Sequence, residues 1–177
     1  MAKFLDSPSI VELAGSDWQI LLEPVRFQYC DDPATIWTVP AGKLTDGPSV
    51  PMYLRWLINP AKFPLSGYLH DDLRVRWTTG NAATDGMLRD AVMAEGHMKS
   101  WQAYLVYLGV RVGTHTGFKS VVPTDVLDQA ISEYARRKKV PASRIEFDEK
   151  HSELIIVYHE KETLMPDLIC IHWMLYT

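Results

Sequence analysis

Cysteine is scarce in this chain, because Cys30 and Cys170 are the only two among 177 residues. Two isolated cysteines make neither a Cys-x-x-Cys redox motif nor a zinc-binding framework. The sequence leaves open whether they pair with each other, and reduced thiols are the simpler expectation for a protein made in the cytoplasm. Dithiol redox chemistry and a cysteine-bound structural zinc are therefore not predicted.

Long apolar runs and an excess of positive charge are missing as well. No stretch approaches the ~20 apolar residues of a membrane-spanning helix, and residues 1–10 lack the apolar core of a signal peptide. The net charge of -4 argues against non-specific binding to nucleic acid. The basic run 136–139 ends a predicted helix, where it complements the helix dipole. We expect a soluble protein with no transmembrane segment and no nucleic-acid partner.

The chain does have the length and the apolar content, 47% of its residues, to bury one substantial core. No internal repeat divides it, so we expect a single domain over residues 1–177. Residues 1–17 show weak periodicity and are expected to form a loosely attached lead-in. Short apolar runs at 18–22, 27–29 and 36–39 predict short antiparallel strands.

The middle of the chain changes to a helical period. Leucines recur every four residues from Leu65 to Leu73, which predicts a helix over 64–77. The next helix is expected to start after Thr84 and to stop at Gly96. Further helices are predicted over 53–58, 98–112 and 124–139, the second of these burying Trp101, Tyr104, Leu105 and Leu108.

The last third of the chain is rich in β-branched and aromatic residues. Runs at 145–147, 154–158 and 168–176 predict a small antiparallel sheet. The final run is apolar on both faces, so we expect it to be covered by the domain or to pair with a partner. The predicted fold class is α+β, with short N-terminal strands, four to five central helices and a small C-terminal antiparallel β-sheet.

Chemistry-bearing side chains gather between residues 39 and 113. A histidine beside carboxylates can act as a general base, because a carboxylate fixes its tautomer and raises its basicity. The same carboxylates can instead hold a divalent cation through their oxygens. The predicted polar cluster consists of Asp46, Ser49, His70, Asp71, Asp85 and Arg111.

Each member of this cluster also has a structural interpretation. Asp46 and Ser49 suit the capping of a helix that begins near residue 51. Asp85 lies in the expected first turn of its helix, where a carboxylate is stabilising in any case. The other three side chains can form one buried hydrogen-bonded network that fixes how the helices pack. The sequence leaves the catalytic and structural interpretations open.

The order of four motifs resembles a known family. Val-Pro-Ala-Gly-x-x-Thr-Asp-Gly-x-Ser-Val-Pro occupies 39–51, Leu-His-Asp-x-Leu occupies 69–73, Thr-Asp occupies 84–85, and Val-Arg-x-Gly occupies 110–113. Together they resemble the phage and prophage family DUF1353 over roughly residues 18–118. The resemblance implies a bacteriophage or prophage origin, and it brings a context and not a mechanism. Residues 119–177 are then a helix plus a C-terminal β extension.

The chain departs from the family pattern at several positions. The family usually has Phe where Lys43 stands, Ala at Pro48, Tyr at Arg74, and Arg-x-x-Ala-Asp over 81–85. Arg74 places a cation one helical turn beyond His70, where it disfavours a protonated histidine or supplies an anion contact. These departures weaken any activity carried over from the family.

A second, fainter resemblance is to secreted and parvoviral calcium-dependent phospholipases. It implies His70 as the base that activates water, Asp71 as a calcium ligand and Asp85 as the group that orients the histidine. Asp46, in the loop 42–47, is the loose candidate for a second calcium ligand. Calcium is favoured over zinc, because no His-x-x-x-His or similar spacing supports a zinc site.

Two functions follow from the sequence, and whether the protein is an enzyme stays open. The first is a virion- or tail-associated accessory or structural protein that binds itself or other phage proteins through its C-terminal sheet. The alternative is a small metal-dependent hydrolase of cell-envelope phospholipid or peptidoglycan, with His70 as its general base. Either would be made in the host cytoplasm, and either can be incorporated into the virion.

Overall fold

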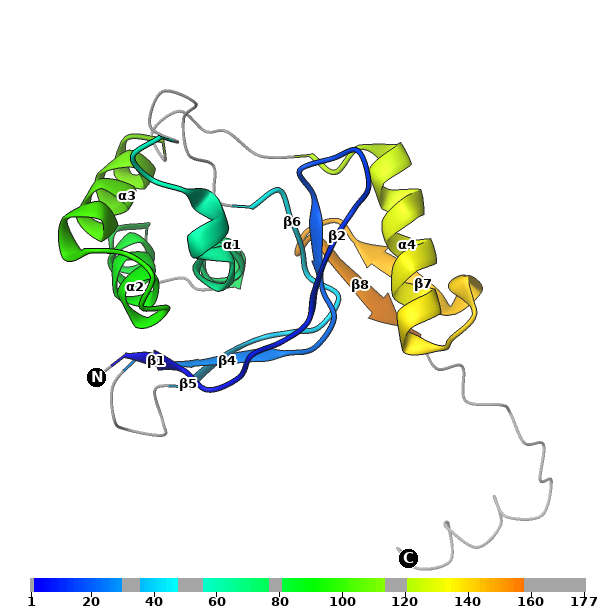
Figure 1. Cartoon of the computed structure of the whole chain (residues 1–177). Coiled ribbons are helices and arrows are strands. Elements are labelled where there is room, and N and C mark those ends of the chain that lie inside the picture. Colours follow the sequence, from blue (N-terminus) through cyan, green and yellow to red (C-terminus); the bar gives the residue numbers. More distant parts are fainter. Residues whose placement is uncertain (1, 30–35, 48–55, 77–80, 114–120, 158–177) are drawn as a thin grey trace, which may run out of the picture.

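One small sheet lies between a single helix and a group of three helices, and a second small sheet lies along that group (Figure 1). The computed structural model describes residues 2–29, 36–47, 56–76, 81–113 and 121–157, without the side chains of Asn81, Val112 and Gly113. Several predicted features therefore lie outside the described residues, namely Cys30, Ser49, Cys170 and the strand expected over 168–176.

Six short strands come first in the chain and form two antiparallel sheets. One sheet has the order β1–β4–β5, and the other has the order β2–β3–β6. Their register pairs Phe27 with Trp37 in the first sheet and Gln19 with Thr45 in the second. The strands are β1 (Lys3–Phe4), β2 (Ile10–Glu12), β3 (Gln19–Leu21), β4 (Val25–Gln28), β5 (Ile36–Val39) and β6 (Leu44–Thr45).

Four helices and a hairpin follow. The helices are α1 (Pro64–Arg76), α2 (Asn81–Ala94), α3 (Ser100–Gly113) and α4 (Thr124–Lys138), and the antiparallel hairpin is β7 (Ile145–Asp148) with β8 (Glu153–Ile156). The α+β class is thus observed. Lys43 forms an isolated antiparallel bridge with Glu153, so the hairpin lies along the edge of the second sheet.

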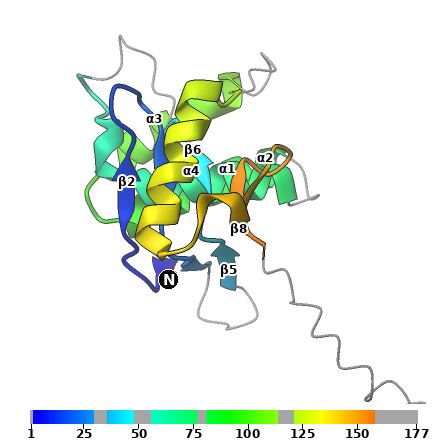
Figure 2. The same cartoon turned by 90° about the vertical axis from the view of Figure 1, so that its right-hand side faces the viewer.

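Strand β3 is apolar on both faces because each face meets a different group of helices. Side chains alternate along a strand, and Ile20 and Leu22 pack into a core with α4 and the hairpin. Leu21 points the other way and packs with α1 and the first sheet. The views from the front and the side show α4 on one side of β2 and β6 and the other helices beyond them (Figures 1 and 2).

Three sequence predictions about helices are confirmed and three are corrected. Helix α1, helix α4 and the stop at Gly96 are as expected, and Gly96 has φ +76° with its N–H donated to the Met93 carbonyl. Helix α2 begins at residue 81, four residues before the predicted start, so Asp85 lies beyond its first turn and the dipole interpretation fails. Residues 56–58 form a turn where a helix was predicted, and 53–55 lie outside the described residues.

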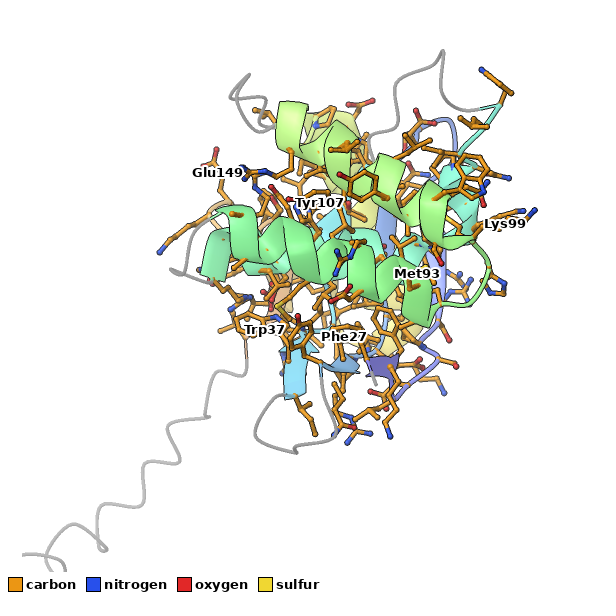
Figure 3. All side chains as sticks on the ribbon, turned by 90° about the vertical axis from the view of Figure 1, so that its left-hand side faces the viewer. Phe27, Trp37, Met93, Lys99, Tyr107 and Glu149 are labelled. Carbon is orange, nitrogen blue, oxygen red and sulfur yellow. The ribbon has the colours of Figure 1, made fainter. Side chains whose placement is uncertain are left out.

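The predicted buried face of α3 is the third correction. Trp101, Tyr104 and Leu108 are 49%, 50% and 39% exposed, whereas Ala103 and Val106 are buried. The helix is apolar on more than one side, and its small residues face α2, which lets the two helices approach closely. Figure 3 looks onto these two helices. The larger side chains are left on the outer side.

The lead-in predicted for residues 1–17 is also wrong. Both β1 and β2 lie within it, and Leu13 is 2% exposed in the core that contains α4. Phe4 packs against Phe27 with ring centroids 4.9 Å apart. These strands are only two and three residues long and are held by pairing with β4 and β3, so the local pattern carries little sign of them.

Candidate functional site

The candidate site lies where three helices meet around Asp85. His70, from the middle of α1, places its Nε2 atom 3.0 Å from Oδ1 of Asp85 in α2. Arg111, near the end of α3, places Nη1 3.4 Å from Oδ2 of the same carboxylate. The Asp85 side chain is fully buried. The structure therefore brings together the histidine, the orienting carboxylate and the arginine that the sequence selected.

Asp71 completes the cluster on its more open side. Its Oδ1 atom lies 3.9 Å from His70 Nδ1, and 43% of its side chain is exposed. The Thr45 hydroxyl donates to Asp71 Oδ2 at 2.7 Å and accepts from the Gly47 N–H at 3.1 Å. Thr45 is a positioning residue that the sequence analysis missed, although it directly precedes Asp46 in the long motif.

Two opposing effects act on the pKa of His70. Burial lowers the pKa, and the hydrogen bonds and negative charges of Asp71 and Asp85 raise it by more, so the net pKa lies above the ordinary value. When the ring is neutral and donates Nε2–H to Asp85, Nδ1 is left as an acceptor on the side of the half-exposed Asp71. That is the orientation a general base requires.

Two other predicted site residues lie on α1 and just after β6. Arg74 is exposed on α1, and Asp46 is half-buried directly after β6. Ser49 lies outside the described residues, so the helix-capping interpretation that included it stays a prediction. Within the described parts of the chain, no group of three or more His, Cys, Asp or Glu side chains is arranged to hold a metal ion.

Comparison with known proteins identifies the family. Residues 19–110 match the family described as "Protein of unknown function (DUF1353)". The chain belongs to the DUF1353 family. No curated protein and no solved structure matches it. The matched segment of this DUF1353 protein runs from β3 into α3 and contains His70, Asp71 and Asp85, while α4 and the β7–β8 hairpin lie beyond it.

A second charged cluster connects that segment to the hairpin, and the sequence analysis missed it. Lys43 is almost fully buried, and its Nζ lies 3.5 Å from Asp72 Oδ1 and donates to the His151 carbonyl at 2.5 Å. Asp72 also accepts from Arg76 at 2.8 Å and from the Trp37 indole at 3.0 Å. Arg76 reaches on to Glu153 of β8. Lys43 thus belongs to a buried ion network on the strand side of α1.

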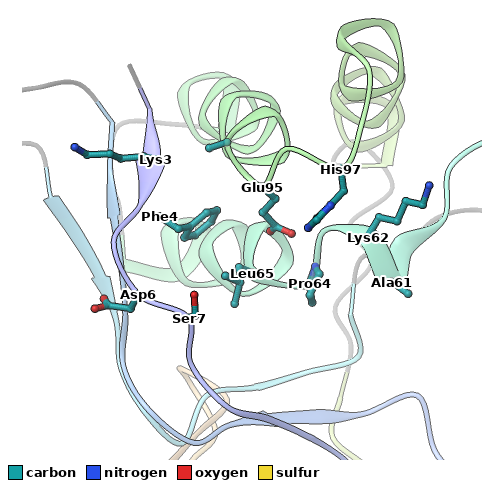
Figure 4. A pocket seen from close by; sticks show the side chains of 11 residues that line it. Lys3, Phe4, Asp6, Ser7, Ala61, Lys62, Pro64, Leu65, Glu95 and His97 are labelled. Carbon is teal, nitrogen blue, oxygen red and sulfur yellow. The ribbon is translucent and has the colours of Figure 1, made fainter.

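A surface cavity of about 410 Å³ lies at the other end of α1 (Figure 4). Phe4 and Ser7, Leu65 at the start of α1, and Glu95 beyond the end of α2 line it, and none of the predicted site residues does. Glu95 Oε1 accepts from the Ser66 N–H at 2.5 Å and from its hydroxyl at 2.7 Å. Burial raises the pKa of Glu95 to about 7 in spite of these bonds.

None of the described helices is both long enough and apolar enough to cross a membrane. This agrees with the absence of apolar runs noted in the sequence.

Proposed function

We propose that this DUF1353 protein is a hydrolase in which His70 is the general base and Asp85 orients it. The observation that carries the proposal is the pairing of His70 Nε2 with a fully buried carboxylate at 3.0 Å. This pairing turns Nδ1 toward Asp71, the most exposed member of the cluster. In the reaction, Nδ1 takes a proton from a water molecule as the water oxygen bonds to an ester or amide carbon, or to an ester phosphorus. The bond from that atom to the leaving oxygen or nitrogen then breaks, and the imidazolium returns the proton to the leaving atom.

Asp85 and Arg111 have defined parts in this scheme. Asp85 holds the ring in the tautomer with hydrogen on Nε2 and stabilises the imidazolium that forms when Nδ1 takes the proton. Arg111, at 3.4 Å from the other oxygen of Asp85, places its positive charge beside that carboxylate and helps to hold it in position. Asp71 and Asp46 would help to hold a calcium ion, but the described residues supply no three-ligand group, so no step is routed through calcium.

The substrate class we propose is a component of the bacterial cell envelope, either phospholipid or peptidoglycan. The test is to incubate the purified chain with phospholipid vesicles and, separately, with peptidoglycan, each with calcium and with EDTA. His70→Asn and Asp85→Asn should each lower the rate by 10²-fold or more. His151→Asn is the matched control, because His151 also pairs with a carboxylate, Asp148, at 2.5 Å. That pair lies on the hairpin, and its loss should leave the rate unchanged.

The pH profile separates a base from a structural histidine. The rate should rise with pH and level off above the raised pKa of His70, because only the neutral ring accepts a proton. If neither substrate is turned over, or if His70→Asn lowers only the stability, the hydrolase proposal is wrong. A rise in melting temperature with calcium, which EDTA reverses and zinc does not produce, would support a calcium site that includes Asp71 and Asp46.

A second candidate function is a virion- or tail-associated protein of phage or prophage origin. The specific observation in its favour is the exposed apolar stripe of Trp101, Tyr104 and Leu108 on α3, which recurs at helical spacing. Such a stripe suits contact with another subunit, in addition to self-association through the C-terminal sheet. Mass spectrometry of purified particles tests this directly, and absence of the chain from particles would contradict it.

A further inference from the structure

Strand β3 carries one polar side chain, Gln19, on the face that packs toward α1. Trp18, Ile20 and Leu22 point into the core that contains α4, so Gln19 points to the opposite side, toward α1. The register agrees, because Gln19 lies opposite Thr45, whose hydroxyl donates to Asp71 on α1. Gln19 therefore lies beneath the helix that carries His70.

Two buried oxygens in the described part of the chain have no hydrogen-bond partner, and both belong to this region. They are Oε1 of Gln19 and the hydroxyl of Tyr68. Tyr68 is fully buried, one helical turn before Asp71, in the core that α1 shares with Leu21. The negative charge of Asp71 acts on the Tyr68 hydroxyl, so the phenol oxygen lies within electrostatic reach of the candidate site.

An unpartnered buried oxygen is costly, and native interiors rarely keep one. These two oxygens have complementary hydrogen-bonding requirements. The Tyr68 hydroxyl has a hydrogen to donate, and the Gln19 carbonyl oxygen has lone pairs that require a donor. They do not bond to each other directly. A water molecule satisfies both, since it accepts from a hydroxyl and donates to a carbonyl, and buried waters typically make about three such bonds.

We propose that Tyr68 and Gln19 hold a structural water molecule beneath α1, as a built-in part of the fold next to His70 and Asp71. The water accepts from Tyr68 and donates one hydrogen to Gln19, and its second hydrogen is available to a carboxylate. A metal cation fits less well, because the Tyr68 hydroxyl and the Gln19 carbonyl are both neutral ligands, and the hydroxyl hydrogen would be left without an acceptor. The inference stands whether or not the protein is a hydrolase.

The first test asks whether one substitution stabilises or destabilises the folded chain. Tyr68→Phe keeps the ring in the core and removes only the hydroxyl. If the hydroxyl had no partner, its removal would stabilise the fold. With the water in place, the substitution leaves that water and Gln19 poorly bonded, so the equilibrium constant for unfolding should rise by roughly three- to thirtyfold. Urea unfolding measures it, and a fall in that constant would overturn the proposal.

The second test asks whether the two side chains share one water. Gln19→Met keeps the length of the side chain and removes its polar atoms. In a double-mutant cycle with Tyr68→Phe, the combined effect on the unfolding constant should fall short of the product of the single effects by about threefold or more. The control pair is Gln19→Met with Tyr104→Phe, which should be additive, because Tyr104 is half-exposed on α3. Additivity in the Tyr68 cycle would contradict a shared water.

A third measurement identifies the occupant. Magnetisation exchange by NMR should detect a long-lived water close to the Tyr68 ring in the wild-type chain and not in the Tyr68→Phe, Gln19→Met double variant. Stabilisation by sodium or calcium that is lost in the double variant would mean that a cation occupies the site, and the proposal would then be wrong.

Discussion

His70 Nε2 lies 3.0 Å from Asp85 Oδ1, and this contact joins α1 to α2 between residues fifteen positions apart. The carboxylate is fully buried, and its second oxygen is the one that faces Arg111 on α3. One buried charge thus links three helices. The same link leaves Nδ1 of the histidine directed at Asp71, on the more open side of the cluster.

The first prediction concerns the titration of His70. Its pKa in the folded state is raised, so between the ordinary pKa and the folded pKa the native state binds more protons than the unfolded state. The stabilisation from His70 is therefore complete below pH ~6.5 and is lost as the pH rises through the folded pKa. NMR titration of the ring should show the raised pKa.

Asp85→Asn supplies the comparison for that titration. It removes one of the two charges that raise the pKa, so the pKa of His70 should fall. An unchanged pKa in this variant would show that the Asp85 contact does not act on the ring as described.

The second prediction concerns Gly42. Its φ is +87°, and a Cβ atom placed there would lie 2.1 Å from the Leu154 carbonyl oxygen, which belongs to backbone that cannot move aside freely. Gly42→Ala should therefore lower the free energy of unfolding by more than about 3 kcal/mol. Gly15→Ala is the matched control, because Gly15 has φ +75° but open space around it. It should cost only about 1 kcal/mol, and equal losses in the two variants would contradict the close approach of the hairpin.

The third prediction concerns the buried Lys43. Lys43→Met keeps most of the volume and removes the charge that faces Asp72 and the donor to the His151 carbonyl. Removing one partner of a buried ion pair costs about 3 kcal/mol. Asp72 keeps Arg76 and Trp37, so the fold should survive, and chemical unfolding can measure the loss. Lys99→Met, on an exposed lysine, should change stability by less than about 0.5 kcal/mol.

The fourth prediction concerns Glu95. Burial raises its pKa to about 7 from an ordinary 4.5, so the folded state binds the extra proton between those two values. Its contribution to stability therefore falls as the pH rises from about 4.5 to 7, by on the order of 2 to 3 kcal/mol in total. Glu95→Gln should remove this slope and stabilise the chain at pH 8 more than at pH 5. Glu146→Gln, on the exposed side of β7, should leave the slope as it is.

Much of the fold follows from local pattern. The leucine spacing predicts α1, the Pro-Thr start and basic end predict α4, and the β-branched runs predict the β7–β8 hairpin. The pattern fails where packing decides. On α3 it selects the large residues Trp101 and Tyr104 as core, whereas the close contact with α2 takes the small ones.

The sequence likewise predicts some residues of the candidate site and misses others. Its motif spacing picks out His70, Asp71 and Asp85, because each stands in a short run of distinctive residues. Thr45, Lys43 and Gln19 were missed, since each is placed by pairing with backbone that is distant in sequence. Only the register of β3 with β6, and the position of α1 above both, puts them beside that helix.

The sequence by itself determined the candidate residues His70, Asp71 and Asp85 of this DUF1353 protein and the positions of α1 and α4, because helical period and residue type are local properties of a chain. The tertiary structure alone decided which partner each charge has. In the folded chain, Asp85 pairs with His70 and Arg111, and Asp72 pairs with Lys43 and Arg76. The reason is that ionic and hydrogen-bonded contacts act over a few ångströms, and only packing brings distant residues that close.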